Sequence, residues 1–309
     1  MAIKRELNQS KVYFNLQFLA SQIVEGMITG IHKSPFHGFS SEFAEHKVYN
    51  NGESTKHIDW KLFAKTDKLF TKRYEEETNL RCHLILDNSA SMHYPKRDKF
   101  SVSKLNKIGF SVLASAVLIH LLKKQRDAVG LSVYGANYDV YTPEKGSERH
   151  FNLLLHQLEN ALNSSPKQSD TNTVKYIHEI AEKLHKRSLI CFFTDLFQYE
   201  AKTEDLFAAL HHLKYNKHEV VLFHTLDYTT EVNFDFDETP KSFVDVETNE
   251  KVDLYAQNIK ELYSDKAKKY IADIKLECAK YNIKYVPVAV TDNFDKIMNT
   301  YLVERQKFG

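Results

Sequence analysis

The sequence predicts an α/β protein with a doubly wound, mostly parallel sheet. From Cys82 onward, short runs rich in β-branched and apolar residues alternate with longer helical patterns, which is typical of βαβ units. Two of these runs end in carboxylates, Asp87 and Asp195, at the edge where an open parallel sheet places its ligand sites. With 309 residues, the chain can also bury a sizeable core without disulfides.

Each expected element follows from a run of this kind. Strands are expected near 82–87, at 128–134 with a short hairpin partner at 138–141, and at 188–194, 219–226 and 284–288. Helices are expected near 99–124, at 149–162, 174–186, 203–215 and 259–281, and from 293 to about 305. The longest apolar stretch, Ile108–Leu122, is shorter than the ~20 residues of a membrane span and contains serines and a histidine, so it predicts a buried helix.

Two segments depart from this alternation. Residues 1–80 contain scattered glycines and candidate strands around 43–49 and 69–74, which predict a small β-rich or mixed subdomain before the main domain at 81–309. Residues 227–253 carry nine acids against two lysines, with three phenylalanines between them. Because those rings need burial, we expect an acidic insertion at about 227–255 that folds as a hairpin. Its acids could pair with the basic stretch from Lys61 to Arg73, or both could be unrelated solvated faces.

Composition excludes several classes of function. The balance of 42 basic and 41 acidic residues provides no global field for gathering nucleic acid or anionic membrane. Three cysteines, Cys82, Cys191 and Cys278, lie far apart without a C-x-x-C pair, so we expect buried thiols in a reducing cytoplasm and neither disulfides nor zinc. The first ten residues contain no apolar signal core, so secretion by that route is not expected.

The loop at residues 87–91 is the most informative stretch of the chain. An apolar run ends at Asp87, and Ser89 and Ser91 follow at alternate positions. A hard divalent cation such as Mg²⁺ prefers oxygen ligands in near-octahedral geometry, and a tight Asp-x-Ser-x-Ser loop can turn three of them inward. The same residue types also suit a helix N-cap, where they satisfy free N–H groups at the start of a helix.

Two further segments supply oxygen atoms that could complete this loop. The strand at 188–194 brings Asp195 to the same edge of the sheet, and Thr171 lies in a polar segment just before a helical pattern. Taken singly, the threonine suits a helix cap and the aspartate a loop acid. In combination they predict an all-oxygen site that suits Mg²⁺ or Mn²⁺ and does not suit zinc. The predicted ligands are Asp87, Ser89, Ser91, Thr171 and Asp195.

These residues resemble the metal-ion-dependent adhesion site of von Willebrand factor A domains. A second set of motifs resembles the domain-of-unknown-function 58 family, and together the two resemblances extend over nearly the whole chain. The motifs are Gly30–Gly38, Glu42-Phe43, Tyr49–Glu53, His57-Ile58-Asp59-Trp60 and Ala64-Lys65-Thr66-Asp67. Nothing near His57 and Asp59 supplies a nucleophile, so we expect these two residues to make structural hydrogen bonds.

The resemblance implies a bacterial, usually cytoplasmic protein with a von Willebrand A-like, Rossmann-like fold. Such proteins are often encoded beside a MoxR-type AAA+ ATPase and are thought to act with it as adaptors. In this type of site, the two serines bind the ion directly, the Asp and Thr residues bind it directly or through water, and a partner's Glu or Asp completes the octahedron. Thr171 is preferred to Thr173 because it lies fourteen residues before His185, the spacing expected in the family.

We therefore expect a non-enzymatic binding module that captures a carboxylate of a protein partner, either the MoxR-type ATPase or its client. The alternative is a metal-dependent, phosphatase-like hydrolase with Asp87 or Ser89 as its nucleophile. Phosphatases of the haloacid dehalogenase type need a second Asp where Ser89 stands, and the sequence has neither a Gly-x-Ser-x-Gly elbow nor a Walker loop. A third alternative is a structural scaffold in which the loop only caps a helix.

Overall fold

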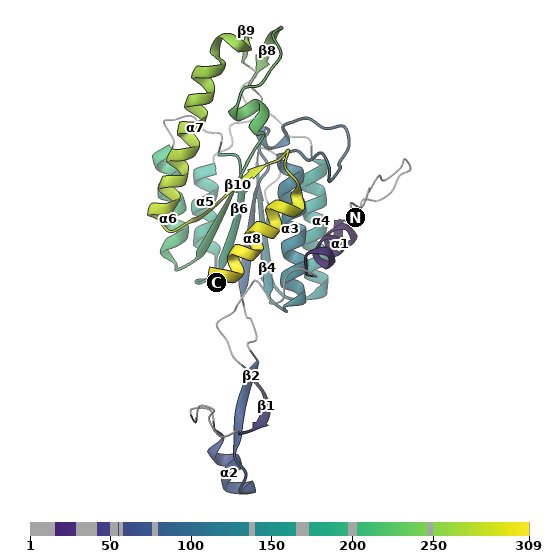
Figure 1. Cartoon of the computed structure of the whole chain (residues 1–309), viewed down its shortest axis with the longest axis vertical. Helices are drawn as coiled ribbons and strands as arrows, with labels where there is room; N and C mark the ends of the chain where they lie inside the picture. The colour runs from purple at the N-terminus through teal and green to yellow at the C-terminus, as the bar shows by residue number, and fades with distance from the viewer. Residues whose placement is uncertain are drawn as a thin grey trace.

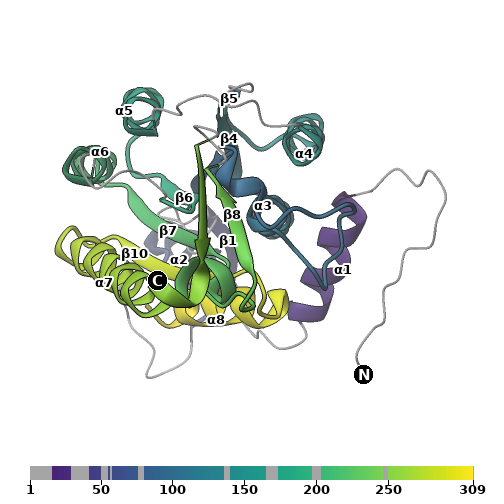
Figure 2. The same cartoon turned by 90° about the horizontal axis from the view of Figure 1, so that it is seen from above.

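The computed structural model of the chain describes residues 16–28, 42–49, 55, 58–75, 80–135, 140–164, 173–196, 203–245 and 250–308. Its centre is a six-stranded sheet with helices on both faces (Figures 1 and 2). Neighbouring strands pair in the order β10-β7-β6-β3-β4-β5, and all pairs are parallel except β4 with β5. The prediction of a mostly parallel α/β sheet is therefore confirmed. The strands are β3 (Arg81–Asp87), β4 (Ala128–Tyr134), β5 (Val140–Lys145), β6 (Leu189–Thr194), β7 (Glu219–Leu226) and β10 (Lys284–Ala289).

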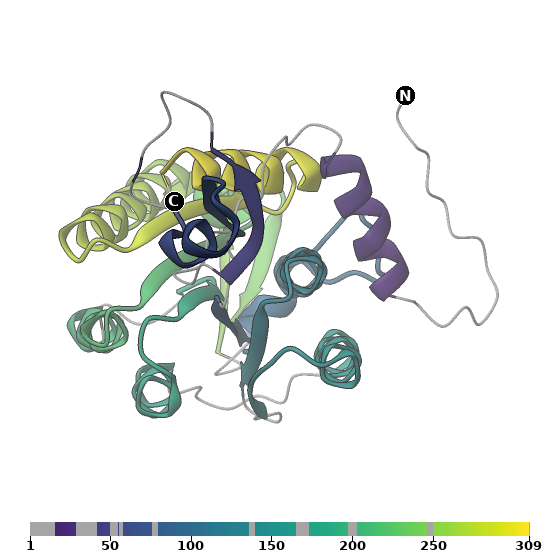
Figure 3. The ribbon, with the colours of Figure 1, turned by 90° about the horizontal axis from the view of Figure 1, so that it is seen from below.

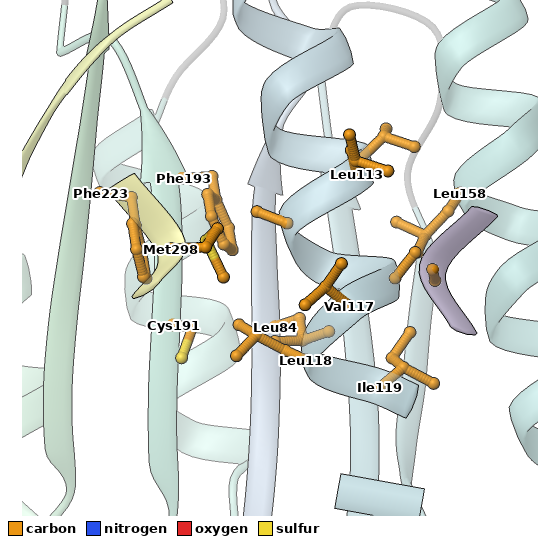
Figure 4. Packing of buried hydrophobic residues seen from close by; sticks show 14 of the residues in the cluster. Leu84, Leu113, Val117, Leu118, Ile119, Leu158, Cys191, Phe193, Phe223 and Met298 are labelled. Carbon is orange, nitrogen blue, oxygen red and sulfur yellow. The ribbon is translucent and has the colours of Figure 1, made fainter. Parts of the chain in front are cut away.

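The helices divide between the two faces of the sheet, and each set closes its own apolar core. One core is covered by α1 (Leu16–Ile28), α3 (Lys107–Lys124), α4 (Glu148–Asn163) and α8 (Phe294–Phe308). The other is covered by α5 (Thr173–Lys183), α6 (Thr203–Tyr215) and α7 (Ala256–Lys280). Because side chains alternate along a strand, Leu84 and Leu86 of β3 enter the first core while Ile85 enters the second. Leu84 lies beside Leu118 in the first core (Figure 4).

Helix α3 is the buried helix that the apolar stretch predicts, but it starts later than expected. Nearly every residue from Ile108 to Leu122 is buried. The helix begins at Lys107 and not near Lys99, because Asn106 caps it: Asn106 Oδ1 accepts from the Gly109 N–H at 2.8 Å. The residues between the Ser91–His93 turn and Asn106 form bends and one turn, with no helix.

The segment before the main sheet forms an arm that extends away from it (Figure 1) and lies in front of the sheet when the molecule is seen from below (Figure 3). In this arm, β1 (Glu42–Val48) pairs antiparallel with β2 (Phe70–Glu75), and α2 (Trp60–Thr66) lies between them in the chain. Asp59 caps α2 by accepting from two backbone N–H groups at 3.0 Å, which is the structural role expected for this residue. His57 lies outside the described residues. Helix α1, by contrast, packs against α3 within the core of the sheet.

The acidic insertion contains the hairpin that its aromatic residues predict. Strands β8 (Pro240–Val244) and β9 (Lys251–Tyr255) pair antiparallel. Phe234 stacks on Phe243 of β8, with ring centroids 5.2 Å apart, and lies 4.4 Å from the ring of Tyr263 in α7. The hairpin and the arm lie at opposite ends of the molecule, so pairing of the insertion with the basic stretch inside one chain is wrong (Figure 1).

Two further expectations concern the thiols and the membrane. The three cysteines are free and buried, as expected. No helix in the described part of the chain combines the length and the apolar character needed to cross a bilayer.

Candidate functional site

The predicted loop begins where β3 ends, at the carboxyl edge of the sheet. Its backbone is held against the neighbouring strand, because the Asn88 N–H donates to the Tyr134 carbonyl at 2.7 Å. A Cβ atom at Gly135 would lie 2.6 Å from the Asn88 carbonyl oxygen, so glycine is needed for this close approach. The Asn88 side chain also contacts Ser164 Oγ, at 3.0 Å from Nδ2. The loop is therefore fixed from two sides.

Within this loop, the three predicted oxygen ligands lie together and are buried. The Ser89 N–H donates to Asp87 Oδ1 at 2.9 Å, which folds the loop back on the carboxylate. The hydroxyl oxygens of Ser89 and Ser91 are 3.0 Å apart. Thr194, the last residue of the adjacent strand β6, donates its hydroxyl to Asp87 Oδ2 at 2.8 Å. These oxygen groups therefore lie close together, and their role as metal ligands stays a prediction.

A simple capping role does not account for the two serines. The short helical turn at Ser91–His93 has Ala90 at its N-cap and no side-chain hydrogen bond to its free N–H groups. The Ser89 and Ser91 hydroxyls contact each other instead.

Asp195 follows β6 and reaches the same edge as Asp87. Burial and the negative charge of Asp195 raise the pKa of Asp87 to about 6. The hydrogen bonds from Ser89 and Thr194 lower this pKa, but their effect is smaller. Among the residues that the structure describes, none forms an ion pair with Asp87. Asp87 is thus a buried carboxylate whose charge is opposed by a second carboxylate and matched by no described cation.

The predicted threonine, Thr171, lies outside the described residues, so its place in the site stays a prediction. Thr173, the other candidate, is buried at the start of α5. The Thr173 side chain lies near the Tyr134 hydroxyl, and this hydroxyl is also close to Thr194 and Asp87. In the described part of the chain, this buried hydroxyl has no hydrogen-bond partner.

Sequence reasoning missed the basic residue of the site. Lys107 Nζ lies 2.7 Å from Asp195 Oδ2 and 2.5 Å from Glu231 Oε1. Burial disfavours its charge, but the two carboxylates raise the pKa of Lys107 above its ordinary value. Lys107 and Glu231 are 124 residues apart in the sequence, so no local spacing connects them.

Behind Asp195, a neutral histidine holds the backbone. Burial lowers the pKa of His224 to about 4, so the ring is uncharged at pH 7. Its Nε2–H donates to the Asp195 carbonyl at 2.9 Å, and its Nδ1 accepts from the Tyr285 hydroxyl at 2.8 Å. With both ring nitrogens engaged, His224 acts in positioning Asp195.

The donor set suits a hard cation. Carboxylate and hydroxyl oxygens of Asp87, Ser89, Ser91 and Asp195 are ligands that Mg²⁺ and Mn²⁺ prefer. Within the described ranges, no group of three or more His, Cys, Asp or Glu side chains could hold a metal ion. A site at this edge would therefore depend on the serine hydroxyls and not on a zinc-type cluster.

Comparison with known proteins gives a family and distant relatives. A family model described as protein of unknown function DUF58 matches residues 45–272. The uncharacterized proteins Rv1480 of Mycobacterium tuberculosis and Mb1516 of Mycobacterium bovis are each 22% identical over 140 residues, 45% of this chain and 42% of theirs. The match thus spans well under half the length of these curated relatives.

Two solved structures are also similar at low sequence identity. An aerotolerance-related membrane protein from Bacteroides fragilis, carrying multiple mutations to serine, has a TM-score of 0.44 at 16% identity and covers 74% of this chain and 100% of its own. The pilus adhesin SpaC from Lactobacillus rhamnosus GG has a TM-score of 0.41 at 10% identity and covers 74% of this chain and 31% of its own.

Proposed function

We propose, for a chain that belongs to the DUF58 family of proteins of unknown function, a role as a non-enzymatic protein-binding module with a metal-ion-dependent adhesion site of the von Willebrand factor A type. The proposed fold of the 81–309 domain is accordingly von Willebrand A-like. One observation carries the proposal: Asp87, Ser89 and Ser91 after β3 lie beside Asp195 after the adjacent strand β6.

Each residue has a separate task in this proposal. The Ser89 and Ser91 hydroxyls would hold Mg²⁺ or Mn²⁺ directly, and Asp87, Asp195 and Thr171 would bind it directly or through water. The bound ion would supply an open coordination position for one carboxylate oxygen of a partner protein. Thr194 and the Ser89 N–H keep Asp87 oriented before the ion arrives, which lowers the cost of organising the site.

The partner we propose is a MoxR-type AAA+ ATPase or its client, offering a Glu or Asp side chain in the cytoplasm. Support for an adaptor role and against catalysis comes from the surroundings of the hydroxyls. Ser89 Oγ contacts Ser91 Oγ and no described histidine, and the ring nitrogens of His224 are both engaged elsewhere. A serine nucleophile is most often activated by an adjacent histidine, and neither serine has one among the described residues.

The experiment compares two double variants of the chain. Ser89→Ala/Ser91→Ala removes the proposed ligands, and Ser101→Ala/Ser103→Ala removes an exposed Ser-x-Ser pair with the same hydroxyl contact, 2.9 Å apart, as a matched control. Isothermal titration with Mg²⁺ and Mn²⁺ should show binding to the wild type and to the control, and none to the first variant. Circular dichroism should show both variants folded.

A pull-down with the proposed MoxR-type ATPase as bait then tests the partner. The complex should form with Mg²⁺, disappear with EDTA and be absent for Ser89→Ala/Ser91→Ala. Wild-type protein that binds neither ion would overturn the metal site. Turnover on phosphate or ester substrates, lost in that same variant, would replace the adaptor role by the hydrolase alternative.

A further inference from the structure

Lys107 is a fully buried lysine placed between two carboxylates. Its Nζ atom lies 2.7 Å from Asp195 Oδ2 and 2.5 Å from Glu231 Oε1, and its side chain has no exposed surface. Lysine is almost never fully buried unless its charge is paired, because moving an ammonium out of water is costly. Its position at the first residue of α3 places this cation at the edge of the sheet where the proposed ligands gather.

Glu231 is held as firmly as the lysine it contacts. It lies in the helical turn Tyr228–Val232 that follows β7 (Glu219–Leu226). Its second oxygen, Oε2, accepts from the Asp227 N–H at 2.8 Å, and the Tyr94 hydroxyl donates to Thr230 in the same turn at 2.8 Å. Glu231 therefore stays against Lys107 without help from a ligand.

Carboxylates thus stand at or after the ends of three neighbouring strands, β3, β6 and β7, at one edge of the sheet. Asp87, Asp195 and Glu231 contribute three negative charges when ionised, and Lys107 contributes one positive charge. The net charge of this group is then two negative units, which one divalent cation neutralises. The ammonium contacts Asp195 and Glu231, which leaves Asp87 as the carboxylate with no described ion-pair partner.

We propose that Lys107 and Glu231 set the charge of the metal site and so make it selective for a divalent cation. The inference rests on the proposed function, since it assigns two further residues to the same site. Lys107 repels any ion bound beside Asp87, and Glu231 attracts it, so the two residues act as a matched pair on affinity. Neither residue needs to ligate the ion.

Four proteins test this charge count: the wild type, Lys107→Met, Glu231→Gln and Lys107→Met/Glu231→Gln. Isothermal titration with Mg²⁺ and La³⁺ measures their affinities. Lys107→Met should bind Mg²⁺ at least about tenfold more tightly, and Glu231→Gln about tenfold more weakly, because each changes one charge beside the ion. The double variant restores the net charge and should bind within about threefold of the wild type. La³⁺ should gain more than Mg²⁺ from Lys107→Met.

Controls separate this inference from the proposed function. Lys123→Met removes a cation of α3 that pairs with Glu148 at 2.6 Å on the surface, and should leave affinity unchanged. Glu231→Gln leaves the Lys107–Asp195 pair in place and is expected to fold even if Lys107→Met does not, so its weaker binding is a test by itself. Equal Mg²⁺ affinity in all folded variants, with binding still lost in Ser89→Ala/Ser91→Ala, would overturn the charge role alone. Absence of Mg²⁺ binding in the wild type would overturn both proposals.

Discussion

Replacing Gly130 by alanine should destabilise the protein, because the ring of His83 lies where a Cβ atom would go. That atom would be 2.5 Å from His83 Nδ1 and 2.9 Å from the carbonyl oxygen of Thr142. The ring is held on both sides, with Ser132 Oγ 2.7 Å from Nε2 and Glu144 Oε1 2.7 Å from Nδ1. One imidazole therefore joins β3, β4 and β5 below the sheet edge that carries the candidate site.

The size of the effect follows from these contacts. Relieving the overlap requires a shift of about 1 Å in the ring or in β5, toward ordinary van der Waals separation. Such a shift breaks at least one of the two hydrogen bonds of the ring, and losing a hydrogen bond to a charged group costs about 1.5–3 kcal/mol. Overpacking adds about 1–3 kcal/mol. We expect Gly130→Ala to lower the free energy of unfolding by roughly 2.5–6 kcal/mol.

Guanidinium unfolding followed by far-ultraviolet circular dichroism measures this loss as a lower midpoint with an unchanged m value. The matched control is Gly26→Ala in helix α1, where the added Cβ would meet nothing within 4 Å. Alanine is a better helix former than glycine, so the control should gain about 0.5–1 kcal/mol. A loss below about 0.5 kcal/mol in Gly130→Ala, typical of a surface substitution, would refute the argument that the ring is fixed.

Three further predictions concern other parts of the fold. Burial opposes ionisation of Glu144, but the hydrogen bond and the charge of His83 lower the pKa of Glu144 below its usual value. The ionised carboxylate therefore stabilises the fold at pH values above the ordinary pKa of a glutamate. Glu144→Gln should be less stable than wild type at pH 7, and the difference should shrink as the pH falls below the ordinary glutamate pKa of about 4.3 and through the lowered pKa of Glu144. Phe193→Ala removes a buried ring stacked 4.5 Å from Phe223 and should cost about 3–5 kcal/mol in the same assay; a loss under about 2 kcal/mol contradicts this. Asp59→Ala removes the cap of α2 and should speed amide exchange there by about fivefold, whereas unchanged exchange would show that the cap is dispensable.

The sheet could be predicted from the sequence because its signals are local. A buried parallel strand is a short apolar run, and the runs ending at Asp87 and Thr194 show where β3 and β6 stop. The start of α3 could not be located in the same way, because Lys99 and its polar neighbours suit a first helical turn as well as a loop. The Asn106 cap decides between the two, and it depends on the geometry of the preceding turns.

In the candidate site as well, some residues could be predicted from local sequence signals and others could not. Asp87, Ser89 and Ser91 lie within five residues and give a readable pattern, and Asp195 follows from the rule that parallel strands end at one edge. Lys107 and Glu231 belong to the site only through contacts across 88 and 124 residues of chain. Tyr134 could not be assigned to the site from the sequence for another reason. Its ring is typical of a core residue of β4, and the position of its hydroxyl near Asp87 depends on how the strands pair.

The arm has a practical consequence for spectroscopy. The chain contains one tryptophan, Trp60, and 60% of its surface is exposed on α2, far from both apolar cores. An indole already in water emits at long wavelength in the folded protein, so melting of the sheet would change the emission little. A molecule that covers the arm would shift the emission to the blue. The emission wavelength of Trp60 therefore reports binding to the arm and changes little when the sheet unfolds.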